Sequence, residues 1–171
     1  MADMPLEIEK KYIIIKPDFA FLATQNGYTR SSITQTYLES APNVTHRVRK
    51  REWQQRVEYT ECSKIRIARD TAIEDERVIT EEEYSSLLKS VKPGTRPITK
   101  ERTTFRYGEL VFEVDVYPEW GRCCIMEVEL PSSDYPLNLP PFITVVDDVT
   151  GVKGYSNASM SHSFPDEPAI D

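Results

Sequence analysis

The stretch that decides the fold is residues 6–15, LEIEKKYIII. Its β-branched and aromatic residues favour a strand, and the side chains of a strand point alternately to its two faces. Glu7, Glu9 and Lys11 therefore share one face, while the opposite face is mainly apolar. The segment predicts a strand with one charged and one apolar face.

The same alternation recurs along the chain, and its charges are sorted by sign. Residues two apart carry the same sign on one expected strand after another, whereas a solvated strand face usually mixes lysine with glutamate to gain cross-strand attraction. The acidic pairs are Glu74/Glu76, Glu113/Asp115 and Glu127/Glu129, and the basic sets are Arg47/Arg49/Arg51, Lys64/Arg66 and Lys100/Arg102. A wet sheet face explains any one pair, but the whole set indicates a shared charged interior.

Strand-like runs occupy most of the chain. Besides residues 6–15, they fall at about 33–39, 45–52, 55–68, 73–79, 96–107, 109–117 and 123–130. About eight strands at this short spacing are typical of a sandwich or barrel. We therefore predict an α+β protein that is mainly β, with one domain over residues 1–162 and a disordered tail over 163–171.

Helices are expected at three places. The sharpest signal is Thr80, which is followed by three glutamates as in a capping box and then by apolar residues at helical spacing. A second candidate lies within residues 17–26, and a weaker one lies near 156–162. All three flank the expected strands.

Composition narrows the classes of function. The 171-residue chain has a net charge of −7, which argues against nonspecific binding to nucleic acid, because such binding needs a basic surface. No run approaches the roughly 18 apolar residues of a membrane span, and the N-terminus lacks the features of a secretory signal, so we expect a cytoplasmic protein. Three cysteines without a CxxC pair and only two histidines disfavour a zinc site built on histidine.

The charged faces can be accounted for if the sheet closes with its charges inward and its apolar faces outward. Such an interior must hold water and ions, because an unpaired charge in a dry interior costs several kcal/mol. Clustered carboxylates without histidine suit hard cations such as Mg²⁺ or Mn²⁺, and basic strands suit phosphate groups. The residues therefore predict a barrel that binds a triphosphate together with metal.

The order of these motifs resembles the CYTH superfamily, the triphosphate tunnel metalloenzymes. Glu7-Ile8-Glu9-Lys10-Lys11 is similar to the ExExK signature, and Lys153-Gly154-Tyr155-Ser156-Asn157 resembles the closing segment of the family, with the charged pairs between them in family order. The match spans roughly residues 6 to 160. The resemblance implies an eight-stranded antiparallel closed barrel, a tunnel with a charged interior and a few flanking helices.

The resemblance also implies roles for individual residues. Lys11 and Tyr37 match positions that act together near the attacking water. Mg²⁺ or Mn²⁺ is expected at Glu7, Glu9, Glu127 and Glu129, with Asp115 as a further candidate ligand and Glu74 and Glu76 serving a second metal or a water. Phosphate oxygens are expected at Arg47, Arg49, Lys100, Arg102 and Lys153.

One position departs from the family pattern. Relatives often show Thr-x-Lys where this chain has Thr60-Glu61-Cys62, so that a cysteine stands at the usual lysine. Lys64 lies two residues further on and shares the same face. Either Lys64 takes over as a substrate-binding residue or the site is altered.

We expect metal-dependent hydrolysis of inorganic tripolyphosphate to pyrophosphate and phosphate, by in-line attack of water. Thiamine triphosphatase and an adenylyl cyclase that converts ATP to cyclic AMP are alternatives on the same fold. A noncatalytic polyphosphate or nucleotide-binding module is another, motivated by Cys62, whereas a lipocalin-like carrier conflicts with the charged faces. The expected partner is a small triphosphate, not nucleic acid or a membrane, and the expected state is a monomer or homodimer.

Overall fold

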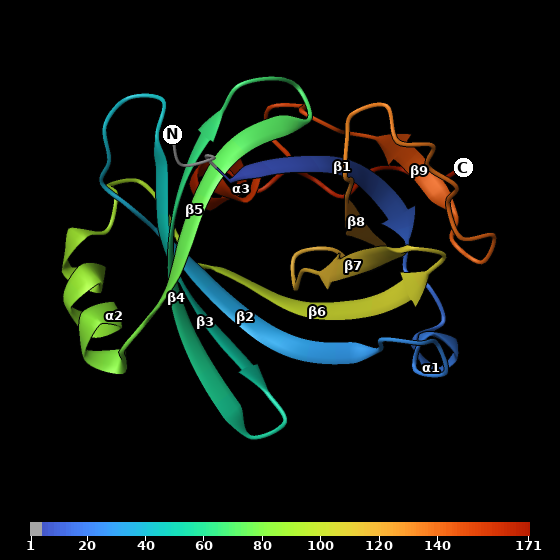
Figure 1. Ribbon diagram of the computed structural model, residues 1–171, viewed down its shortest axis with the longest axis horizontal. Coiled ribbons are helices and arrows are strands. Elements are labelled where there is room, and N and C mark those ends of the chain that lie inside the picture. The colour runs from blue at the N-terminus through green and yellow to red at the C-terminus, as the bar shows by residue number, and fades with distance from the viewer. Residues whose placement is uncertain (1–4) are drawn as a thin grey trace.

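The structure is a computed structural model that describes residues 5–171. The strands are β1 (Leu6–Ile15), β2 (Thr29–Leu38), β3 (Thr45–Trp53), β4 (Arg56–Arg66), β5 (Thr71–Ile79), β6 (Ile98–Tyr107), β7 (Leu110–Val116), β8 (Cys123–Glu129) and β9 (Val145–Asp148). The helices are α1 (Phe19–Leu22), α2 (Glu81–Leu87), which continues as the 3-10 turn η1 (Leu88–Ser90), and α3 (Asn157–His162). Figure 1 shows α1 and α2 on the outside of a strongly curved sheet, with α3 behind β1 and β5.

Eight of the strands close into an antiparallel barrel. They pair in the order β5-β4-β3-β2-β6-β7-β8-β1, and the first residues of β1 pair with β5 to complete the circle. The ninth strand, β9, pairs with Tyr12–Ile14 of β1. The predicted eight-stranded antiparallel barrel is therefore confirmed. Within residues 5–171, no helix has the length and apolar character needed to cross a membrane.

The largest apolar cluster lies outside the barrel wall. Phe112 and Val114 of β7 are fully buried on the face opposite to Glu113, and Leu22 of α1 packs with them. The loop over residues 135–143 covers this face with apolar side chains. Burying one such side chain contributes about 1.5–3 kcal/mol, so the outward apolar faces hold the barrel together, as the alternation predicts.

At one end of the barrel the inward faces also become apolar. Ile13 and Ile125 lie two residues from Lys11 and Glu127 on the same inward faces, and both are buried. Met160 of α3 belongs to the same cluster. This apolar plug fills one end of the barrel, and the charged part of the interior lies beyond it.

Residues 163–171, where the sequence suggests a disordered tail, include several that contact the barrel. Phe164 packs against Trp120, whose Nε1 donates a hydrogen bond of 2.9 Å to the carbonyl of Pro165. The carboxylate of Glu167 accepts backbone hydrogen bonds from Gly121, Arg122 and Cys123. The prolines and acids of this segment are typical of a tail, so its composition gives no sign of these contacts.

Local signals fix several element boundaries. Thr80 caps α2 as predicted, because its hydroxyl accepts a hydrogen bond from the Glu83 backbone. The strand expected from residue 33 begins earlier, at Thr29, because β6 supplies a partner for its first residues. Strand β9 was not predicted, since its four residues become a strand only through the free edge of β1.

Candidate active site

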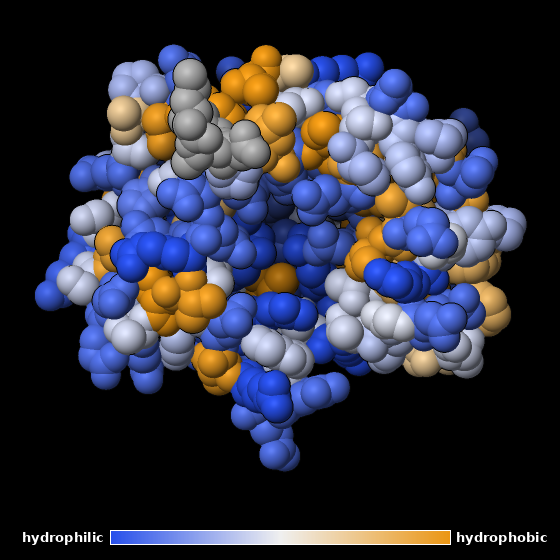
Figure 2. Space-filling view, viewed as in Figure 1, coloured by the Kyte–Doolittle hydropathy of each residue, from blue (hydrophilic) through white to orange (hydrophobic). Residues whose placement is uncertain are grey.

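A cavity of about 470 Å³ occupies the charged part of the barrel. Figure 2 shows it as a central hollow with hydrophilic walls. The predicted site residues that line it are Glu7, Glu9, Lys11, Tyr37, Arg47, Arg49, Lys64, Glu74, Glu76, Lys100, Arg102, Glu127 and Glu129. The structure thus brings together residues from β1 to β6 and β8, and the inward charged faces predicted from the alternation are present.

Carboxylates predominate where β1 meets β8. Glu9 stands opposite Glu129 in the strand register, which places two acids side by side. Burial raises the pKa of Glu9 well above its ordinary value, and the negative charge of Glu127 raises it further. Burial, with Glu7, also raises the pKa of Glu129. A cation bound beside these two acids would stabilise their ionised forms.

Two other acids of this wall are held by lysines. Lys64 Nζ lies 2.6 Å from Glu7, and Lys11 Nζ lies 3.4 Å from Glu127. Burial works against the ionised forms, yet the nearby cations outweigh it and lower the pKa of Glu7 and, more strongly, that of Glu127. Both carboxylates are therefore ionised and face the cavity.

Lys100 and Arg102 of β6 form the base of the cavity around Asp115. Arg102 donates hydrogen bonds of 2.7 and 2.9 Å to the two oxygens of Asp115, and Lys100 Nζ lies 2.8 Å from one of them. Asp115 is completely buried and does not line the cavity. Its predicted place among the metal ligands is thus not supported by its surroundings, because both oxygens already bind cations and instead fix where those cations lie.

Lys100 has a further set of contacts. Its Nζ lies 3.4 Å from Asn157 Oδ1, which also accepts a hydrogen bond of 2.9 Å from the Tyr117 hydroxyl. Burial lowers the pKa of Lys100 to about 8, with Asp115 opposing the shift and Arg102 adding to it. The helix α3, through its first residue, therefore helps to hold the deepest cation of the site.

Arginines of β3 form the opposite wall, and a buried glutamine holds one of them. Arg47 and Arg49 line the cavity, whereas Arg51 does not: its guanidinium lies 4.5 Å from the centre of the Trp53 ring. Gln35 of β2 is fully buried and accepts two hydrogen bonds from Arg49. Charge alternation gave no signal for a neutral amide, so the sequence reasoning missed Gln35.

The two candidate catalytic residues also line this cavity. Lys11 Nζ donates a hydrogen bond of 3.1 Å to the carbonyl of Tyr155, in addition to its ion pair with Glu127. The Tyr37 hydroxyl accepts a hydrogen bond of 3.1 Å from Gln35. Lys11 is surrounded by acceptors that suit an ammonium group, and Tyr37 keeps its hydroxyl proton free to donate.

Lys153 lies apart from the main group. It lines an adjoining cavity of about 280 Å³, together with Arg66 and Arg69. This second cavity shares Glu7 and Lys64, among other residues, with the main one. Lys153 thus lines the adjoining cavity and not the main one.

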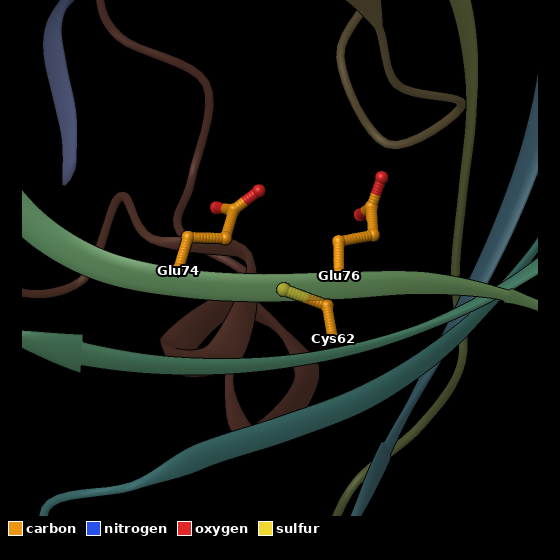
Figure 3. A group of neighbouring side chains, drawn as sticks. All are labelled: Cys62, Glu74 and Glu76. Carbon is orange, nitrogen blue, oxygen red and sulfur yellow. The ribbon is translucent and has the colours of Figure 1, made fainter. Parts of the chain in front are cut away.

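Cys62 lies on the inward face of β4, as its parity predicts. It is 2% exposed and stands opposite Glu76 in the register, and Figure 3 shows both side chains. Lys64 stands opposite Glu74. Lys64, two residues further along β4, reaches the cavity. Burial raises the pKa of the Cys62 thiol to about 11.

Glu113 also lines the cavity, although it was not among the predicted site residues. It forms an ion pair with Arg102, and burial raises the pKa of its carboxyl group. The alternation that paired it with Asp115 placed both residues on one face, but only Glu113 reaches the open space. A strand pattern gives the face of a residue and not its depth along the barrel.

Comparison with solved structures places the fold among known triphosphatases and putative cyclases. The inorganic triphosphatase NE1496 has 24% identity and a TM-score of 0.58, with 93% of this chain and 96% of that chain covered. The PH1819 protein from Pyrococcus horikoshii OT3 has 18% identity and a TM-score of 0.58, over 75% of this chain and 80% of that one. The predicted resemblance is thereby confirmed for the fold.

A third similar structure is that of a putative cyclase with triphosphatase activity. It is the putative adenylyl cyclase HpAC1 from Hippeastrum, described as having a dominant triphosphatase activity, with 16% identity and a TM-score of 0.53 over 74% of this chain and 80% of that chain. In sequence alone, no family model and no curated protein matches this chain.

Proposed function

We propose that this protein is a divalent-metal-dependent triphosphatase whose substrate is inorganic tripolyphosphate, cleaved to pyrophosphate and phosphate. One observation carries the proposal: a single cavity is lined by the acids Glu9 and Glu129 and by the arginines Arg47, Arg49 and Arg102. A metal-bound triphosphate presents the matching charges to both walls. The fold that this chain shares with the triphosphatase NE1496 supports the same reading.

The donor set fits Mg²⁺ or Mn²⁺. The carboxylates of β1 and β8 are hard oxygen ligands, and burial raises the pKa of Glu9, so a cation bound beside it would stabilise the ionised form of this carboxyl group. Glu7, Glu9, Glu127 and Glu129 line the same cavity and would hold the ion once their side chains move together around it. The ion would neutralise phosphoryl oxygens and lower the pKa of a bound water.

The side chains of the cavity would position the substrate and stabilise the charge that develops on it. Arg47, Arg49 and Arg102 would bind the phosphoryl oxygens and offset the charge that develops on them, while Asp115 and Gln35 keep two of these arginines in place. Lys11 would bind the ligand as a cation, and the Tyr37 hydroxyl would donate to a phosphate oxygen or to the attacking water. Since phosphoryl transfer needs little covalent help from protein, orientation and charge are the main contributions.

The lining favours an inorganic substrate over a nucleotide or a thiamine ester. Tyr37 is the single aromatic side chain among the described residues that line the main cavity, and it is tied to Gln35 through its hydroxyl. Bases and other flat rings bind best when they stack on exposed aromatic faces. A triphosphate without an organic group needs no such platform.

The test is a comparison of phosphate release from tripolyphosphate, thiamine triphosphate and ATP, each with Mg²⁺ or Mn²⁺, with cyclic AMP measured in the ATP reactions. We expect the fastest release from tripolyphosphate. Faster turnover of thiamine triphosphate, or formation of cyclic AMP, would replace the proposed substrate with one of the two alternatives. Tight binding of tripolyphosphate without release of phosphate under either metal would identify a noncatalytic binding module.

A further inference from the structure

Cys62, Glu74 and Glu76 form a compact group of potential metal ligands on β4 and β5. Their sulfur and carboxylate oxygens lie within 4.8 Å of one another, and no other trio of His, Cys, Asp or Glu in residues 5–171 converges in this way. Figure 3 shows the thiol and both carboxylates on neighbouring strands, with the sulfur directed toward the two glutamates. The group lies on the wall of the main cavity, so small ions can reach it.

Two atoms of this group lack hydrogen-bond partners. Cys62 is 2% exposed, and among the described residues its thiol takes part in no hydrogen bond. Glu74 Oε2 is buried and also accepts no hydrogen bond, although Lys64 Nζ lies 3.3 Å away. Buried polar atoms without partners cost free energy. One cation placed between them would satisfy both atoms at once.

The neighbouring cations do not saturate the two carboxylates. Lys64 forms ion pairs with both Glu74 and Glu7, and its Nζ lies closer to Glu7, at 2.6 Å. Arg47 lies 3.8 Å from Glu76, which is beyond hydrogen-bond distance. Both carboxylates can therefore still supply an oxygen atom to a cation.

We propose that Cys62, Glu74 and Glu76 form a binding site for a thiophilic divalent cation such as Zn²⁺, with its fourth position open to water or a phosphate oxygen. Thiolate ligands select such metals, whereas Mg²⁺ requires oxygen ligands in near-octahedral geometry. Tetrahedral Zn²⁺ needs bonds of about 2.3 Å to sulfur and about 2.0–2.2 Å to oxygen. The flexible glutamate side chains can close the distance from their present separation.

Binding has a defined proton balance and a defined effect on the cavity. The Cys62 thiol is neutral before binding, so the cation displaces its proton to solvent and takes the sulfur as a thiolate. The cation also draws Glu74 away from Lys64 and occupies space beside Arg47. Zn²⁺ at this site therefore inhibits triphosphate turnover, but its binding does not depend on any hydrolytic activity.

Cobalt provides the direct test, because a Co²⁺ ion bound to a thiolate gives a charge-transfer absorption that carboxylate ligands do not produce. The full chain is titrated with Co²⁺ without triphosphate or Mg²⁺, and Zn²⁺ is then added to displace it. We expect the absorption in the wild type and in Cys124→Ala, whose cysteine lies in the outer apolar cluster, and its loss in Cys62→Ser. Absence of the band in the wild type, or its survival in Cys62→Ser, overturns the proposal.

A second variant covers the case in which Cys62→Ser does not fold. The double substitution Glu74→Gln and Glu76→Gln leaves the thiol in place and removes the two carboxylates. We expect at least a tenfold weaker Co²⁺ affinity, judged from the concentration at which the band is half formed. An unchanged affinity would show that the thiolate binds metal without these glutamates, and the site as proposed would be wrong. Neither readout requires the protein to hydrolyse a triphosphate.

Discussion

Gln35 and Arg49 face each other across β2 and β3, and the Arg49 Nε and Nη2 atoms both donate hydrogen bonds to Gln35 Oε1, at 3.1 and 2.9 Å. The same amide donates from its Nε2 to the Tyr37 hydroxyl at 3.1 Å. Gln35 is fully buried and does not itself line the cavity. One neutral side chain therefore positions a phosphate-binding candidate and a catalytic candidate together.

Replacing Gln35 with methionine tests this positioning. Arg49 would lose both hydrogen bonds, and a hydrogen bond to a charged group is worth about 1.5–3 kcal/mol. We expect the KM for tripolyphosphate to rise at least tenfold, with a smaller change in kcat. Steady-state kinetics measures both, and Gln25→Met on the outside of the barrel serves as the control. An unchanged KM in Gln35→Met would show that Gln35 does not position Arg49 for substrate binding.

Arg47 and Arg51 offer a matched pair on one strand. Both lie on the face predicted to carry phosphate-binding arginines, but Arg47 lines the cavity and Arg51 stacks on Trp53. We expect Arg47→Ala to weaken tripolyphosphate binding at least tenfold and Arg51→Ala to change it less than about threefold, because only Arg47 can reach a ligand. Calorimetry of ligand binding distinguishes them. Equal effects of the two substitutions would contradict the placement of the cavity.

Asp115→Asn should damage stability more than any exposed acid does. The change removes the charge that Lys100 and Arg102 share and leaves two cations buried around a neutral group. Breaking a buried ion pair in this way costs about 3–5 kcal/mol. Urea unfolding measures the loss, with Asp147→Asn, on the exposed face of β9, as the control. A loss below about 1 kcal/mol would show that Asp115 does not organise the cations.

The raised pKa of Glu9 gives a prediction about pH. A carboxyl group whose pKa is higher in the folded chain binds its proton more tightly there than in the unfolded chain. Its contribution to stability is therefore present at low pH and is lost as pH rises from the unfolded pKa through the folded one. Without metal, Glu9→Gln should remove this decline and raise the melting temperature near neutral pH.

Added metal should reverse the order of the two melting temperatures, so that the wild type becomes more stable than Glu9→Gln. Mg²⁺ should stabilise the wild type by binding the folded state, and it should stabilise Glu9→Gln much less, because the variant lacks one carboxylate of the acidic wall. Thermal melts with and without Mg²⁺ provide the measurement, and Glu109→Gln in the exposed turn between β6 and β7 should behave like the wild type. A less stable Glu9→Gln in the absence of metal would refute this reading of the acidic wall.

The alternation of charge predicted the inward faces but not the depth of each residue along the barrel. It placed Glu7, Glu9 and Lys11 in the cavity correctly, because β1 crosses the charged part of the interior. It could not separate Glu113, which reaches the cavity, from Asp115, which lies beneath it. Depth depends on the register between strands and on where the apolar plug begins. The alternation of side chains along a strand gives neither.

Features that depend on partners far away in sequence also lay beyond a local pattern. Strand β9 forms because the edge of β1 is available, and Glu167 is anchored by backbone groups near residue 122. Gln35 carries no charge, so its role became visible only once Arg49 and Tyr37 were placed beside it. The predicted fold was more complete than the predicted site for this reason.

The central claim is that a triphosphate bound in the cavity loses its terminal phosphate by hydrolysis. Phosphorus NMR of tripolyphosphate incubated with the protein and Mg²⁺ tests it most directly, with Glu9→Gln as the parallel sample. The account predicts equal amounts of pyrophosphate and phosphate from the wild type and almost none from the variant. Unchanged tripolyphosphate with the wild type under both Mg²⁺ and Mn²⁺, or full activity of Glu9→Gln, would contradict it.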